Sequence, residues 1–184
     1  SFLTKSSCTK ENTAVSLGRF GKRTRSSAVS GCISSTRPDR IGSANGVSLY
    51  SANAASYSMT NITAAADWVT TRNIDVTNNS WGGSSSSAGF DYFSRMFDYQ
   101  SRFYQDSYVA SAGNGGIGNN VGQPGAAWNI ITAGSFNDNG TASWSGDTMS
   151  SFSSTGDAAT GCQKPNVVAS GSCIDTLGLA PTWI

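Results

Sequence analysis

Histidine is absent from this sequence, and charged residues are few: only 12% of the 184 residues are Asp, Glu, Lys or Arg. Without histidine, the chain lacks the side chain that most often serves as a general base near neutral pH and as a metal ligand. Its four cysteines form no Cys-x-x-Cys motif. We therefore expect neither a metal site nor a cofactor.

Long apolar runs are also absent, so we expect no membrane span, which needs roughly 20 apolar residues. The hydrophobic content of 38% over 184 residues is enough for one domain with a buried core. We expect a single domain over residues 1–184, in which residues 1–25 form a basic leader. Residues 1–40 hold eight basic and two acidic side chains, but they show no pattern of interleaved aromatic residues, so we expect no nucleic-acid binding.

Abundant Ser, Gly, Asn and Thr together with little charge are common in secreted proteins. The sequence starts at Ser1 rather than Met, which favours removal of a signal or pro-segment and a secreted location. Disulfide bonds are then the expected role of the cysteines. Three connectivities are possible, and we favour the sequence-local pairs Cys8–Cys32 and Cys162–Cys173.

Three sequons, at Asn61, Asn78 and Asn139, indicate a glycoprotein. The Asn139 sequon lies in a predicted turn and is the most usable of the three. We expect the Asn78 sequon to be buried in a strand.

Short strands alternate with helical segments along the chain, which indicates an α/β fold with a mainly parallel sheet. Apolar periodicity predicts helices at 26–35, 60–71 (with Thr60 as the cap) and 90–106. We expect strands at 46–52, 75–83, 109–112, 129–135 and 166–169, with a hairpin arm at 143–152.

The stretch 109–116 carries the first candidate site. Its small residues suit a buried strand, and the following Gly-Asn-Gly-Gly ends that strand at Asn114. An exposed amide at the carboxyl end of a parallel strand lies where open α/β sheets place their ligand sites. Taken alone, an asparagine in a glycine-rich loop is more often a turn residue.

Five segments, in this order and at this spacing, resemble the central portion of a subtilisin-like serine protease of the subtilase family: residues 78–83, 109–116, 123–134, 152–156 and 164–171. The resemblance implies a three-layer subtilisin-like α/β fold, apparently truncated, with a mainly parallel central sheet. It implies that the Asn114 amide is the side-chain donor of an oxyanion hole. It also implies an edge strand that pairs with an extended peptide, formed by Ser80, Trp81 and Gly82, and a first specificity pocket walled by Ala110, Ser111, Ala112 and Gly113.

The catalytic triad of that family is missing from this sequence. Arg25 stands where the family motif has its histidine, no Asp precedes Asp39, and the sequence ends at Ile184, just where the nucleophile segment is expected to follow. An arginine does not deprotonate in proteins and cannot act as a general base. No pattern places a lysine in a pocket.

Three functions remain open at this point. The first is a catalytically inactive subtilisin-like domain, a pseudoprotease that binds a peptide or protein. The second is one chain of a processed secreted serine endopeptidase whose other segments complete the triad. The third is a secreted toxin or interaction protein built on this fold. The predicted helices also look too few to cover both faces of the sheet. We therefore expect a second copy, a partner chain or a cleaved C-terminal segment to cover the face next to residues 167–169.

Overall fold

The computed structural model describes residues 13–18, 29, 32–54, 56–84, 89–156 and 163–172. Three of the four cysteines, Arg25 and half of the predicted helix at 26–35 lie outside these residues. In the other half, residues 29 and 32–34 are helical, as predicted. No described helix is long and apolar enough to cross a bilayer.

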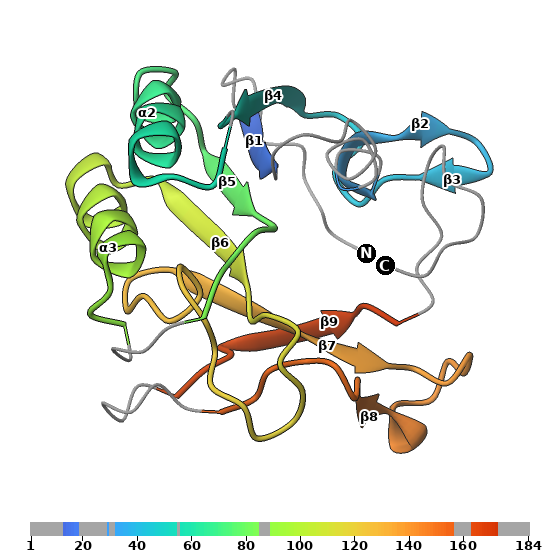
Figure 1. The fold of residues 1–184 in the computed structure, drawn as a ribbon. Coiled ribbons are helices and arrows are strands. Elements are labelled where there is room, and N and C mark those ends of the chain that lie inside the picture. Colours follow the sequence, from blue (N-terminus) through green and yellow to red (C-terminus); the bar gives the residue numbers. More distant parts are fainter. Residues whose placement is uncertain are drawn as a thin grey trace.

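The described elements alternate between strands and helices, as the sequence predicts (Figure 1). The helices are α2 (Met59–Thr70), α3 (Tyr92–Tyr104) and a short 3-10 turn (Trp144–Gly146). The strands are β1 (Thr13–Gly18), β2 (Thr36–Arg37), β3 (Arg40–Ile41), β4 (Ser48–Asn53), β5 (Val76–Asn79), β6 (Ser107–Ser111), β7 (Ile131–Asn137), β8 (Thr148–Met149) and β9 (Val167–Ser170).

Seven of these strands form one sheet in the order β4-β1-β5-β6-β7-β8, and β9 pairs with β7. Every pairing in this sheet is parallel except that of β7 with β8. The predicted α/β fold with a mainly parallel sheet is confirmed. Strand β1 was not predicted: it lies inside the expected basic leader and inserts between β4 and β5.

Each main helix starts at a polar cap and buries one apolar side. In α2 the cap is Ser58, whose side chain accepts the Asn61 N–H, so the prediction of Thr60 as the cap was two residues late. In α3 the Asp91 side chain accepts the Ser94 N–H. Helix α3 ends where Gln105 adopts a left-handed conformation with φ of 60°. The predicted hairpin arm at 143–152 is the 3-10 turn followed by β8, which pairs antiparallel with β7.

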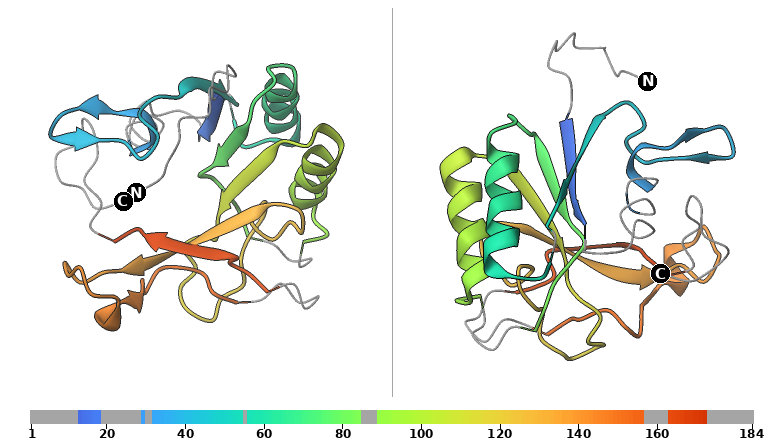
Figure 2. Two further views of the ribbon diagram at one scale, coloured as in Figure 1. Left: turned by 180° about the vertical axis from the view of Figure 1, so that it is seen from behind. Right: turned by 45° about the horizontal axis from the view of Figure 1, so that its top comes forward.

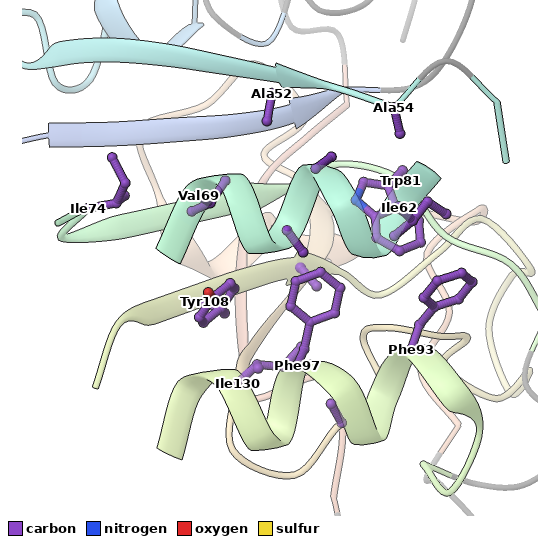
Figure 3. Packing of buried hydrophobic residues seen from close by; sticks show 14 residues of the cluster. Ala52, Ala54, Ile62, Val69, Ile74, Trp81, Phe93, Phe97, Tyr108 and Ile130 are labelled. Atoms are coloured by element: carbon purple, nitrogen blue, oxygen red, sulfur yellow. The ribbon is translucent and has the colours of Figure 1, made fainter. Parts of the chain in front are cut away.

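The hydrophobic core lies between the two helices and one face of the sheet (Figure 3). The indole of Trp81 is part of this core and meets the ring of Phe93 edge to face at 5.4 Å between centroids. Phe97 packs on Tyr108 of β6 at 5.3 Å. Such aromatic pairs add to the free energy gained from burial alone.

Both α2 and α3 cover this same face of the sheet (Figure 2). On the opposite face, Val76 of β5, Ile131 of β7 and Val167 of β9 are 40%, 46% and 51% exposed. The described helices therefore leave apolar side chains of a parallel sheet in contact with solvent, as the sequence led us to expect. We call this surface, defined by Val76, Ile131 and Val167, the open sheet face.

The structure bears on two predicted modifications, the disulfide at Cys32 and the glycosylation sequons. Cys32 is a half-buried thiol whose pKa is raised by burial, and its predicted partner Cys8 lies outside the described residues, so this pairing stays a prediction. The prediction that Asn78 is buried was wrong, because this residue is only partly buried. Asn139 is exposed in a turn with φ of 50°, as predicted for the most usable sequon.

Candidate functional site

The carboxyl ends of β5 and β6 lie side by side and form the candidate site. The two strands are parallel neighbours, with Asn79 aligned to Ala110. This confirms that the segments leading to Ser80 and Ala112 are adjacent and parallel. Polar groups that follow the two strands are therefore brought to one edge of the sheet.

Asn114 lies in the loop after β6, and its side chain is exposed. Within the described part of the chain, the Asn114 amide makes no hydrogen bond, so its N–H donors face solvent rather than their own loop. The backbone on either side needs glycine, because Gly113 and Gly116 have φ of 99° and 90°. These conformations strain any residue with a side chain.

A serine from a distant part of the sequence holds this loop on both sides of Asn114. The buried Ser154 hydroxyl accepts the Gly115 N–H at 3.0 Å, and the Ser154 N–H donates to the Gly113 carbonyl at 3.1 Å. Asn114 therefore projects from a loop that is fixed at the residue before it and the residue after it. The pattern of residues 152–156 indicates a family segment but no role for Ser154.

Further bonds join the same two segments. The Gly116 N–H donates to the Phe152 carbonyl at 2.9 Å, and the Gly118 N–H donates to the Thr155 hydroxyl at 2.9 Å. The Gly156 N–H donates to the Asn119 carbonyl at 2.8 Å. Segment 152–156 is thus the support on which the Asn114 loop rests.

The segment Ser80–Gly82, which continues β5, presents its backbone rather than its side chains. Ser80 and Gly82 are exposed, whereas the Trp81 side chain is buried and its indole N–H donates to Asn79 Oδ1 at 3.1 Å. The parallel pairing of Leu17 with Asn79 directs the Ser80 N–H toward β1, whereas the backbone groups of Trp81 and Gly82 make no hydrogen bond to the described residues. Free main-chain groups of this kind can pair with an extended peptide.

The loop around Gln123 fixes the end of this segment, and sequence analysis gave this residue no role either. The Gly83 N–H donates to the Gln123 carbonyl at 2.9 Å. A Cβ atom at Gly82 would lie only 2.8 Å from the same carbonyl oxygen, so the close approach requires glycine. Sequence signals in Gly82-Gly83 and Gln123-Pro124-Gly125 predict turns, but they do not show that the two turns meet.

The predicted pocket wall, Ala110–Gly113, is mostly core. Ala110 and Ala112 are buried, and the Ala112 N–H donates to the Ala133 carbonyl at 2.9 Å. Ser111 is exposed and Gly113 is half-buried, so a ligand can reach the Ser111 side chain and the loop backbone. The structure brings Asn114, the Ser80–Gly82 backbone and Ser111 to the same end of the sheet.

No described side chain near Asn114 is placed to remove a proton from a serine. The one buried lysine in the described residues, Lys164, is 3% exposed, and its amine donates to the Ile130 carbonyl at 2.8 Å and to Asn166 Oδ1 at 2.9 Å. These bonds join the segment before β9 to the start of β7, which is a structural role. Among the described residues, no group of three or more Asp, Glu, Cys or His side chains could hold a metal ion.

Comparisons with known proteins agree with this fold. The model of the Subtilase family, Peptidase S8, matches residues 26–182. Serine protease AprX of Bacillus subtilis (strain 168) is 37% identical over 76 residues, which make up 41% of this chain and 17% of AprX.

Solved proteases share the architecture at low sequence identity. The self-cleaved protease domain of PatA superposes with a TM-score of 0.71 at 16% identity, over 92% of this chain and 69% of that chain. The prenylagaramide maturation protease PagA gives 0.68 at 18% identity, over 88% of this chain and 63% of that chain. The chain therefore spans about two thirds of these proteases and a much smaller part of AprX. Because the family model covers most of its length, the chain belongs to the subtilase family, Peptidase S8.

Proposed function

We propose that this chain is a subtilase domain that binds an extended peptide or protein segment and does not cleave it unaided. One observation carries the proposal: the exposed Asn114 amide and the unpaired backbone of Trp81 and Gly82 lie at the same end of two adjacent strands. An extended peptide gains affinity from main-chain bonds to such a backbone. The Asn114 amide adds two N–H donors for a peptide carbonyl.

The absence of a proton acceptor supports binding without cleavage. A serine hydroxyl becomes a nucleophile when a base lies within hydrogen-bond reach, and this sequence contains no histidine. Lys164 is buried and already bonded to Ile130 and Asn166. An amide such as Asn114 contributes about 3–4 kcal/mol to acyl transfer when the nucleophile and base are present. In this chain alone, we assign it to binding.

A second candidate is one chain of a processed serine endopeptidase whose remaining segments supply the triad. The open sheet face favours it, because a parallel sheet is normally covered on both sides and the similar solved proteases are longer. A complementing segment, a partner chain or a second copy would then cover Val76, Ile131 and Val167.

Peptide binding is tested by titrating the purified chain with a library of extended peptides. We expect Asn114→Ala to weaken the best ligand about fivefold, the value for one net hydrogen bond. Its free energy of unfolding should change by less than about 0.5 kcal/mol, because the side chain is exposed. Asn45→Ala, at an exposed asparagine in the turn before β4, is the matched control. Equal affinity of the two variants would contradict the proposed site.

Catalytic status is tested separately with a fluorophosphonate probe followed by intact mass measurement. We expect no covalent adduct on the chain alone. Labelling of the chain alone would contradict the non-cleaving assignment. Labelling that arises only after the rest of a subtilase fold is supplied would support the second candidate.

A further inference from the structure

Helix α3 carries a row of four large apolar side chains beside its core-facing side, and of these only Met96 packs in part against the core. Tyr92, Met96, Tyr99 and Phe103 recur at intervals of four, three and four residues, which places them on one line along the helix. Tyr92, Tyr99 and Phe103 are 44%, 57% and 64% exposed, and Met96 is half-buried. We call these four residues the α3 stripe.

The core-facing side of α3 is a different set of residues. Phe93 and Phe97 pack against the sheet and are fully buried. The α3 stripe is therefore additional apolar surface that burial of the helix does not require. Contiguous exposed apolar surface on a folded domain commonly marks an interaction site, and aromatic residues are enriched at the centres of interfaces.

Two contacts hold rings of the α3 stripe in place before any partner binds. The Tyr92 hydroxyl is hydrogen-bonded to the Thr63 hydroxyl of α2 at 2.9 Å. The rings of Tyr99 and Phe103 stack at 5.3 Å with 14° between their planes. Side chains that are already ordered lose less conformational entropy on binding.

We propose that the α3 stripe is the interface between two copies of this chain, with the two α3 helices packed antiparallel about a two-fold axis. This symmetry sets Tyr92 of one copy against Phe103 of the second copy, and Met96 against Tyr99. The spacing of the stripe is that of helix pairs that pack side by side. The interface is isologous, so the assembly closes as a dimer.

The charges beside the stripe select the second copy as the partner. Asp91, Arg95, Asp98 and Arg102 alternate in sign along one flank. Reversing this order sets Asp91 opposite Arg102 and Arg95 opposite Asp98, so antiparallel copies are complementary. Asp91 caps the helix and Asp98 accepts the Asn129 N–H at 2.6 Å, and a carboxylate has capacity for further donors. A lipid surface would instead favour a flank of basic residues only.

Dimerisation is tested by sedimentation equilibrium over a range of chain concentrations up to about 100 µM. We expect a monomer–dimer equilibrium that Phe103→Ser and Tyr99→Ser each weaken on the order of 30-fold, as for an interface hot spot. Trp144→Ser is the matched control, because Trp144 is 84% exposed in the turn before β8. Thermal melts of the variants verify that the fold is kept.

A charge swap tests the antiparallel register. Chains with Arg95→Asp alone, and chains with Asp98→Arg alone, place like charges opposite each other and should dimerise more weakly than the parent. A mixture of the two variants restores opposite charges on both sides and should recover heterodimers.

Three results would overturn the proposal. One is a chain that stays monomeric throughout. Another is a mixture of the charge variants that associates no better than either variant alone. The third is a dimer that Val167→Asp abolishes and Phe103→Ser leaves intact, which would place the interface on the open sheet face. None of these outcomes bears on peptide binding at Asn114.

Discussion

Ser153 and Ser154 are neighbours with the same burial and opposite roles. Their side chains are 1% and 2% exposed, and each hydroxyl accepts one backbone N–H. Ser153 accepts from Ser135 in the sheet, whereas Ser154 accepts from Gly115 next to Asn114. Comparing the two serines therefore distinguishes a residue that stabilises the sheet from one that positions the Asn114 loop.

We expect Ser153→Ala and Ser154→Ala to lower the free energy of unfolding by similar amounts, about 0.5–1.5 kcal/mol, because each removes one partly buried hydrogen bond from a backbone N–H. Only Ser154→Ala should broaden or shift the side-chain amide resonance of Asn114 in nitrogen-15 NMR spectra. An Asn114 resonance that responds equally to both variants would show that Ser154 acts through general stability and not by positioning.

Residue patterns predicted Asn114 as a turn residue at the end of a strand, because Gly-Asn-Gly-Gly is a local signal. They could not identify Ser154, since a hydrogen bond between residues separated by 39 positions follows no periodicity. Trp81 shows the converse. The resemblance to the family placed Trp81 at a peptide-binding edge. In the structure its side chain packs in the core, and only its backbone can face a ligand.

At the scale of elements, the carboxylate of Asp106, which follows α3, is in an environment that disfavours its charged form. Burial and the nearby Asp75 carboxylate raise the pKa of Asp106 above its ordinary value. The folded state then binds this proton more tightly than the unfolded state. Keeping Asp106 ionised at neutral pH costs stability, and that stability returns as the pH falls through the raised pKa.

We therefore expect Asp106→Asn to melt at a higher temperature than the parent near neutral pH. The difference should shrink as the pH is lowered through the raised pKa of Asp106, because the parent carboxyl then takes up a proton. Melting curves across this range make the comparison, with Asp147→Asn in the loop before β8 as a control. A gain for Asp106→Asn that stays constant with pH would exclude ionisation as its cause.

The sequence predicted the type of each element correctly where a periodic pattern of apolar residues extended over several turns. Helices α2 and α3 bury one side each and were predicted within a few residues of their ends. Strand β1 was missed because its six residues lie in a segment dominated by basic side chains. Its pairing with β4 and β5 is a tertiary event that a short run does not signal on its own.

For the whole molecule, the open sheet face is the feature that most needs a partner. Val76, Ile131 and Val167 are exposed on a sheet whose other face holds the core. Burying the remaining half of each such side chain would be worth on the order of 1 kcal/mol. A chain that leaves them in water forgoes this stabilisation.

We expect the native chain to bind a hydrophobic dye such as ANS, and Ile131→Asp together with Val167→Asp to reduce that fluorescence while the protein stays folded. Val69→Asp, at a fully buried position of α2, should unfold the chain instead. Dye binding that the paired change leaves unaltered would mean that the open sheet face is covered in solution.

The bonds between the Asn114 loop and segment 152–156 also set an order of folding. Strands β5 and β6 and helix α3 are close in sequence and can assemble from local contacts. The loop that carries Asn114 depends on hydrogen bonds to Phe152, Ser154 and Thr155, and the hydroxyls of the last two accept from Gly115 and Gly118, 39 and 37 positions earlier. Contacts of large sequence separation form late, because the intervening chain must first be ordered. During synthesis the strands β5 and β6 can thus take shape while the proposed peptide-binding end is still unformed, so the nascent chain acquires this part of its fold before its proposed site.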